Sequence, residues 1–180
     1  MFKLLKKVLE IGEATIRYPF TPLEVAPGFR GKPEYKVEPC ISCGACALAC
    51  PANAITIHSD LDKGIRSLSL FYGRCIFCGR CEEVCPTGAI TLSTDFELAA
   101  FSKEDLICHA DFPLTKCRKC GRFFAPAKEL GYVLLLLAQA GLPESELAKR
   151  ESLLETCPEC RRMLGVEKLQ ETQILQMEGR

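Results

Sequence analysis

The sequence predicts an α+β fold in three parts, and three observations lead to this division. Two copies of one four-cysteine run mark a central domain at residues 40–98. An apolar helix pattern followed by a proline-rich stretch marks an N-terminal helix and extended arm at residues 1–39. Two Cys-x2-Cys pairs mark a small helical extension at residues 99–180. A chain of 180 residues suits one compact domain with such additions.

The N-terminal part predicts an amphipathic helix over residues 1–17. Its apolar residues recur at helical spacing, at Phe2, Leu5, Leu9, Gly12 and Ile16. The helix could pack on the protein's own core. We favour docking on a partner or in a membrane interface, with Lys3, Lys6 and Lys7 toward anionic headgroups.

The arm at residues 18–39 contains five prolines and two glycines, which predicts an extended segment without a long helix. Its apolar side chains indicate that it lies against something, either this protein's own body or a partner. These side chains are Tyr18, Phe20, Leu23, Val25 and Phe29.

The central domain is defined by the spacing C-x2-C-x2-C-x3-C-P, which occurs twice. The first copy consists of Cys40, Cys43, Cys46 and Cys50, and the second of Cys75, Cys78, Cys81 and Cys85. Aligning residues 40–57 with residues 75–92 gives 10 identities in 18 positions. The repeat predicts two half-domains related by a twofold axis.

This spacing is that of two-cluster bacterial ferredoxins, in which the fourth cysteine of each run binds the other run's [4Fe–4S] cluster. One cluster is therefore expected on Cys40, Cys43, Cys46 and Cys85, and the other on Cys75, Cys78, Cys81 and Cys50. Disulfides are not expected in a chain without a secretory signal, and zinc ribbons rarely space four cysteines so tightly. Two neighbouring clusters without a substrate site indicate electron transfer.

Strands are expected after each fourth cysteine, at residues 54–58 and 89–93. Residues 66–72 alternate in polarity, and a turn at residues 60–64 predicts that they pair back as a hairpin.

The C-terminal extension predicts a short helix capped by Ser102, a helix from Pro126 to Gln139 and another over residues 144–155. After Cys160 the chain is polar and would fray or form a final helix.

Cys117-x2-Cys120 and Cys157-x2-Cys160 predict one four-thiolate metal site. Zinc is the default, a rubredoxin-like iron has the same ligands, and disulfides are the weakest alternative. Cys108 is interpreted as a small apolar residue.

Composition excludes some classes of function. The 23 basic and 23 acidic residues balance, so the chain has no basic excess for binding nucleic acid. Thirteen cysteines indicate a reducing compartment and metal ligation. The apolar stretch at residues 132–138 is far too short to span a bilayer, so no transmembrane helix is expected. The sequence shows neither a nucleophile–base pair nor a nucleotide-binding loop, so nothing in it indicates an enzyme in its own right.

These features together resemble a known family. The N-terminal helix, the arm motifs Tyr18-Pro19-Phe20 and Phe29-Arg30-Gly31-Lys32-Pro33, and the run from Cys75 to Thr87 resemble the ferredoxin-like subunit of respiratory complex I. The likeness is closer to the corresponding subunits of formate hydrogenlyase and hydrogenase-4, whose C-terminal extension carries similar cysteine pairs. The resemblance covers essentially the whole chain, most firmly residues 12–100.

The resemblance implies a non-catalytic electron-transfer subunit of a membrane-bound [NiFe]-hydrogenase complex. It would be peripheral, on the cytoplasmic side of the inner membrane. Its partners would be the small hydrogenase subunit and a ferredoxin subunit linked to formate dehydrogenase. The same role in a complex I-type NADH/quinone oxidoreductase is one alternative. A free ferredoxin with a zinc tail is another, which the apolar arm argues against.

Overall fold

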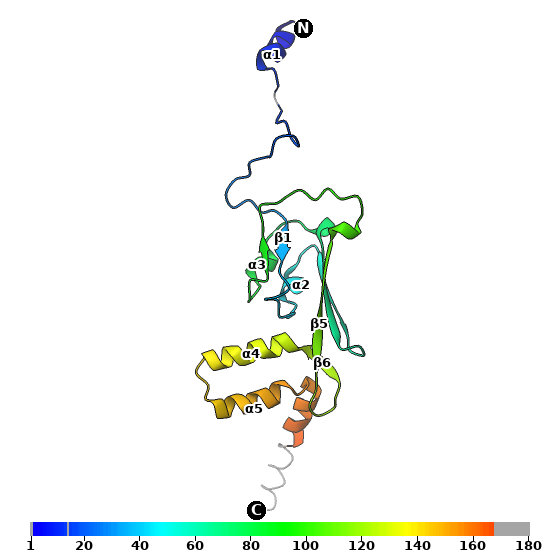
Figure 1. Ribbon diagram of the computed structural model, residues 1–180, viewed down its shortest axis with the longest axis vertical. Coiled ribbons are helices and arrows are strands. Elements are labelled where there is room, and N and C mark those ends of the chain that lie inside the picture. Colours follow the sequence, from blue (N-terminus) through cyan, green and yellow to red (C-terminus); the bar gives the residue numbers. More distant parts are fainter. Residues whose placement is uncertain (1, 14, 168–180) are drawn as a thin grey trace, which may run out of the picture.

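The computed structural model describes residues 2–13 and 15–167. Figure 1 shows three parts along the longest axis, with the N-terminal helix at one end, the cysteine-rich domain in the middle and the C-terminal helices at the other end. The mixed helix and strand content confirms the predicted α+β class. The helices and strands, in chain order, are α1 (Phe2–Ile11), β1 (Pro33–Tyr35), α2 (Ala45–Ala49), β2 (Ile55–Asp60), β3 (Ile65–Phe71), η1 (Tyr72–Arg74), α3 (Arg80–Glu83), β4 (Ile90–Leu92), η2 (Glu104–Leu106), β5 (Ile107–Lys116), β6 (Phe123–Pro126), α4 (Ala127–Gln139) and α5 (Glu144–Leu154).

Helix α1 is shorter than the predicted helix over residues 1–17 and stands away from the rest of the molecule (Figure 1). It ends at Gly12, whose φ of 64° is the left-handed conformation that closes many helices. Its apolar side chains are exposed, including Phe2 at 87% and Leu9 at 76%. The alternative that this helix packs on the protein's own core is therefore wrong.

The second half of the arm packs against the protein's own body. Strand β1 pairs antiparallel with β4, and the Gly31 amide donates to the Ser93 carbonyl oxygen at 2.8 Å. Phe29 meets Phe96 edge-on, with ring centroids 5.8 Å apart. Phe20 is 93% exposed, so the first half of the arm still presents apolar surface.

The core lies beside a four-stranded sheet of order β2-β3-β5-β6. Strands β2 and β3 form the predicted hairpin, and the Lys63 amide in its turn donates to Asp60 Oδ1 at 2.9 Å. Leu68 and Leu70 of β3 and Phe112 of β5 are at most 2% exposed. Strands β5 and β6 were not expected, and through β5, which pairs with β3, the first part of the extension belongs to the central sheet.

Helices α4 and α5 match the two helices expected in the extension and pack against each other. The chain reverses between them at Gly141, whose φ is 85°. The short helix expected after Ser102 is a 3₁₀ turn, η2, in which the Glu104 amide donates to Ser102 Oγ at 3.3 Å. Residues 158–167 are helical. The rest of the segment expected to fray or form a helix, residues 168–180, lies outside the described part of the chain.

Within the described ranges, no helix is both long and apolar enough to cross a bilayer.

Candidate metal centres

The two cysteine runs fold into two nearly identical loops. Ser42 and Phe77 occupy equivalent positions and both adopt left-handed backbone conformations, with φ of 57° and 53°. Gly44 and Gly79 follow with φ of 84° and 80° and begin α2 and α3. Two left-handed residues within three positions curl each loop tightly around its cysteines. The matching conformations agree with the twofold repeat that the sequence predicts.

Each loop borders a small cavity. The first contains about 340 Å³ of space free of atoms, including the part open to solvent, and the second about 360 Å³. The thiols lining the first cavity are Cys40, Cys43, Cys46 and Cys85. The thiols lining the second are Cys75, Cys78, Cys81 and Cys50. Each cavity therefore has three cysteines from one run and the fourth cysteine of the other run, as in the expected pairing.

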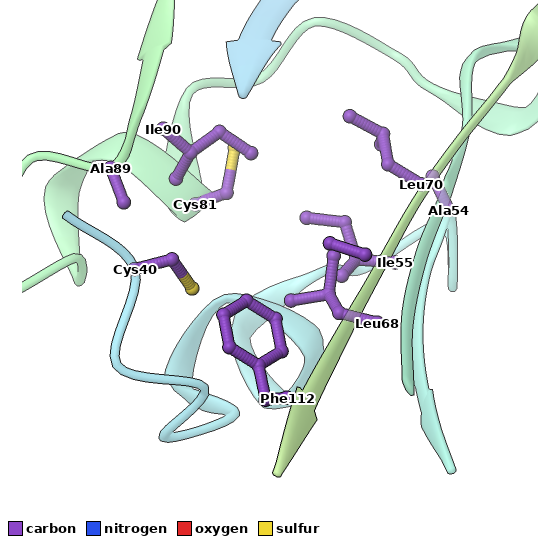
Figure 2. Packing of buried hydrophobic residues seen from close by; sticks show 10 residues of the cluster. Cys40, Ala54, Ile55, Leu68, Leu70, Cys81, Ala89, Ile90 and Phe112 are labelled. Carbon is purple, nitrogen blue, oxygen red and sulfur yellow. The ribbon is translucent and has the colours of Figure 1, made fainter. Parts of the chain in front are cut away.

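The walls between these thiols are largely apolar and are also exchanged between the halves. Ala89 and Ile90 of the second half line the first cavity, whereas Ala54 and Ile55 of the first half line the second. Figure 2 shows Cys40 and Cys81 within one cluster of buried hydrophobic residues. A buried, apolar setting limits the access of water to anything held there.

Backbone amides point at several sulfurs. The amides of Ala54 and Ala89 lie 3.2 Å from Cys50 Sγ and Cys85 Sγ, and the Ser42 amide lies 3.4 Å from Cys40 Sγ. Such N–H donors stabilise negative charge on thiolates and cluster sulfurs.

Burial, in contrast, disfavours negative charge on the thiols and raises their pKa values. It raises the pKa of Cys46 to about 12 and that of Cys81 to about 11. These thiols would remain protonated near neutral pH without a bound cation, so metal binding must release their protons. Four converging thiols, amide donors and apolar walls fit a [4Fe–4S] cluster at each cavity.

The third group of cysteines lies at the far end of the molecule. Cys117 and Cys120 follow β5, and Cys157 and Cys160 follow α5. Their four Sγ atoms all lie within 4.8 Å of one another, and Cys120 Sγ is 3.8 Å from Cys157 Sγ. Thiolates about 2.3 Å from a tetrahedral zinc ion are separated by about 3.8 Å, so the arrangement fits one mononuclear ion.

The two cysteine pairs of this site are also joined by polar contacts. The Cys157 amide donates to Cys117 Sγ at 3.3 Å, and this bond is the largest of those that lower the pKa of the Cys117 thiol to about 6. Ion pairs join Arg118 to Glu155, at 3.3 Å, and Arg122 to Glu159. The site therefore connects the end of β5 to the end of α5.

The structure also reveals polar contacts to the first loop that cysteine spacing did not indicate. Lys128 Nζ on α4 donates to the carbonyl oxygens of Val37 and Glu38 at 3.2 and 2.9 Å, just before Cys40. Tyr132 Oη donates to the Pro86 carbonyl oxygen at 3.4 Å, just after Cys85. Helix α4 thus contacts both chain segments that bring ligands to the first cavity.

Comparison with known proteins agrees with this geometry. A family model described as a 4Fe-4S dicluster domain matches residues 39–89. Fold and site therefore define a two-cluster iron–sulfur protein. The chain is 48% identical over 162 residues to formate hydrogenlyase subunit 6 of Escherichia coli (strain K12), covering 90% of this chain and 89% of that protein. It belongs to the family of that subunit and is an iron–sulfur electron-transfer subunit.

Other similarities are shorter. NADH-quinone oxidoreductase subunit I of Cytophaga hutchinsonii is 47% identical over 53 residues, which are 27% of this chain and 30% of that protein. A chain of the archaeal membrane-bound sulfane sulfur reductase aligns with a TM-score of 0.42 and 31% identity, covering 57% of this chain and 56% of that one.

Proposed function

We propose that this protein relays electrons within a membrane-associated [NiFe]-hydrogenase complex of the formate hydrogenlyase type and catalyses no reaction itself. The observation that carries the proposal is the 48% identity to formate hydrogenlyase subunit 6, because it extends over 90% of the chain. A likeness confined to the dicluster domain would fit any ferredoxin.

Each cluster would be held by three cysteines of one run and one of the other. We assign Cys40, Cys43, Cys46 and Cys85 to the first cluster, and Cys75, Cys78, Cys81 and Cys50 to the second. When bound, each cluster supplies a site for reversible one-electron reduction. Helix α2 contains Cys46 and ends just before Cys50, so the third and fourth cysteines of the first run are separated by one helical turn, a rise of about 6 Å. The chain therefore keeps the two sets of ligands close together.

The C-terminal site would hold zinc on Cys117, Cys120, Cys157 and Cys160. Zinc favours four thiolates in a closed tetrahedral structural site. The contacts of this site support a structural role, since it fastens β5 to α5 at the point where the extension has little core of its own.

Helix α1 and the first half of the arm would dock on other subunits or at the membrane interface. Leu5, Leu9 and Phe20 are exposed at 58%, 76% and 93%, and burying these surfaces is favourable. The proposed partners are the small hydrogenase subunit and a ferredoxin subunit linked to formate dehydrogenase. The protein would lie peripherally on the cytoplasmic side of the inner membrane.

The same role in a complex I-type quinone reductase is the second candidate. It is favoured by the similarity to subunit I of NADH-quinone oxidoreductase, but that similarity spans only 27% of the chain. A free ferredoxin is disfavoured because it would leave the apolar surface of α1 and the arm uncovered.

Anaerobic affinity purification of the tagged protein from membranes of its own host tests the proposal. We expect hydrogenase activity and nickel to co-purify, with about eight iron and eight sulfide per copy of this protein in addition to those of its partners. Co-purification of NADH–quinone activity without nickel would establish the second candidate. Recovery of the protein alone, without either activity, would contradict both complexes and favour the interpretation as a free ferredoxin.

A further inference from the structure

Two buried hydroxyl groups beside the first cavity have no hydrogen-bond partner within the part of the chain that the structure describes. Tyr35 ends β1, and Ser42 lies between Cys40 and Cys43; both line the first cavity. Among the described residues, Tyr35 Oη and Ser42 Oγ are buried side-chain oxygens without a partner. Ser42 is only 1% exposed. A buried polar group left unpaired costs about 1–3 kcal/mol, so both hydroxyls are expected to bond to something in the cavity.

The second cavity offers no such donors. Phe77 occupies the position that Ser42 has in the first loop, with nearly the same φ, 53° against 57°. The described residues that line the second cavity include no serine, threonine or tyrosine. They are cysteine, glycine and apolar residues, with Pro33 and Leu70 among them. The two loops therefore share a backbone but differ in the hydroxyl groups that face the cavity.

A hydroxyl group such as that of Tyr35 or Ser42 can donate a hydrogen bond to an anionic acceptor. The sulfurs of a reduced iron–sulfur cluster and of its thiolate ligands are such acceptors.

We propose that Tyr35 and Ser42 donate hydrogen bonds to sulfur atoms at the first site and thereby hold its reduction potential above that of the second site. The inference rests on the proposed binding of a cluster at each cavity. Reduction adds negative charge to the cluster, so a hydrogen bond to sulfur is stronger in the reduced state and raises the potential. At partial reduction the added electron then resides mainly at the first site, beside α4.

The test uses the full-length protein, purified anaerobically, with the substitutions Tyr35→Phe and Ser42→Ala, alone and combined. Tyr18→Phe and Ser69→Ala are matched controls, because Tyr18 Oη donates to the exposed Glu97 and Ser69 Oγ bonds to His109 on the sheet. Redox titration followed by electron paramagnetic resonance measures the two potentials. We expect each cavity substitution to lower the higher of the two potentials, which belongs to the first site. The double substitution should lower it further. The other cluster and both control variants stay at wild-type values.

A second readout separates hydrogen bonding from packing. In partially reduced wild-type protein, electron–nuclear double resonance should detect strongly coupled protons that exchange in D₂O. Part of this signal should disappear in Tyr35→Phe and in Ser42→Ala. Wild-type protein that lacks eight iron and eight sulfide would overturn the proposed function itself. Full cluster content with unmoved potentials, equal shifts of both clusters, or an unchanged exchangeable signal would overturn this inference alone.

Discussion

Arg66 Nη1 donates a hydrogen bond to the carbonyl oxygen of Ser42 at 3.1 Å, which ties strand β3 to the middle of the first cysteine loop. The same side chain donates from Nε to Ser59 Oγ at 3.0 Å. Its guanidinium also lies 3.8 Å from Glu129 on α4. One arginine therefore connects the first loop, the β2–β3 hairpin and the C-terminal extension.

Replacing Arg66 with Gln should loosen the first site selectively. A hydrogen bond to a charged group contributes about 1.5–3 kcal/mol to stability. Because Arg66 is only 20% exposed, solvent screening weakens this contribution only slightly. Iron release to a chelator under anaerobic conditions should become faster for the cluster at the first site and stay unchanged for the cluster at the second site. Arg80→Gln is the control, since the Arg80–Glu83 pair is 59% and 52% exposed. Equal release rates in both variants would contradict a special role of Arg66.

Substituting Cys157 with Ser should remove the C-terminal metal and leave both clusters in place. Cys157 is 5% exposed and contacts the other cysteine pair through its amide and its sulfur. Metal analysis should show loss of zinc with about eight iron retained. Limited proteolysis should then cut within the extension.

The matched control is Cys108→Ser, because Cys108 packs against the core but is not one of the cysteines that we propose as ligands. It should retain the full metal content. Loss of both clusters in Cys157→Ser would show that the C-terminal site is needed for the whole fold.

Gly31→Ala should detach the arm from the central domain. A Cβ at this position would collide with the Asp95 backbone, meeting its carbonyl oxygen and lying 2.7 Å from its carbonyl carbon. Backbone atoms cannot move aside as a side chain can, so the hydrogen bonds of Gly31 and Lys32 to Ser93 and Asp95, next to the β1–β4 pair, must be disrupted. We expect a loss of several kcal/mol in the free energy of unfolding, as for other substitutions that introduce strain into packed structure.

Gly131→Ala serves as the comparison for Gly31→Ala. Gly131 lies inside α4 with nothing within 4 Å of an added Cβ, so alanine should stabilise that helix by up to about 1 kcal/mol. Thermal unfolding of the two variants beside the wild type should give shifts of opposite sign. A destabilised Gly131→Ala would indicate that α4 is packed against something on this face.

Leu5→Asp combined with Leu9→Asp should release the protein from membranes without affecting its clusters. Both leucines lie on the exposed apolar surface of α1. Charges at these positions would remove the favourable free energy of burying that surface in a docking interface. Glu10→Ala, which changes a charge on α1 without touching its apolar residues or the proposed headgroup contacts, should reduce recovery far less. Fractionation of host cells gives the distribution, and iron and sulfide content gives the integrity. Unchanged recovery with membranes after deletion of residues 1–17 would exclude docking through this helix.

The cysteine runs and the twofold repeat could be predicted because their signals are local. The spacing within each run follows from the bite of one loop around one cluster, and the exchange of Cys50 and Cys85 follows from the helical turn after each run. The hairpin could be predicted from alternating apolar residues and one turn. Strand β5 shows the same alternation at Ala110, Phe112 and Leu114, but it contains Pro113, a residue that is rare inside strands.

The end of α1 at Gly12 was missed for a different reason. Apolar spacing continues to Ile16 and favours a longer helix, whereas the left-handed turn at the glycine stops it.

By itself, the sequence determined which cysteines form each run or pair, the α+β class and the family, because each depends on residues close together along the chain or on matches to relatives. Only the tertiary structure decided what surrounds the two cavities. Arg66, Tyr35 and Lys128 reach the first loop from β3, β1 and α4, and nothing in their spacing marks them. Contacts between residues far apart along the chain depend on how whole elements pack, so the difference between two cavities with nearly the same backbone becomes visible only in the folded protein.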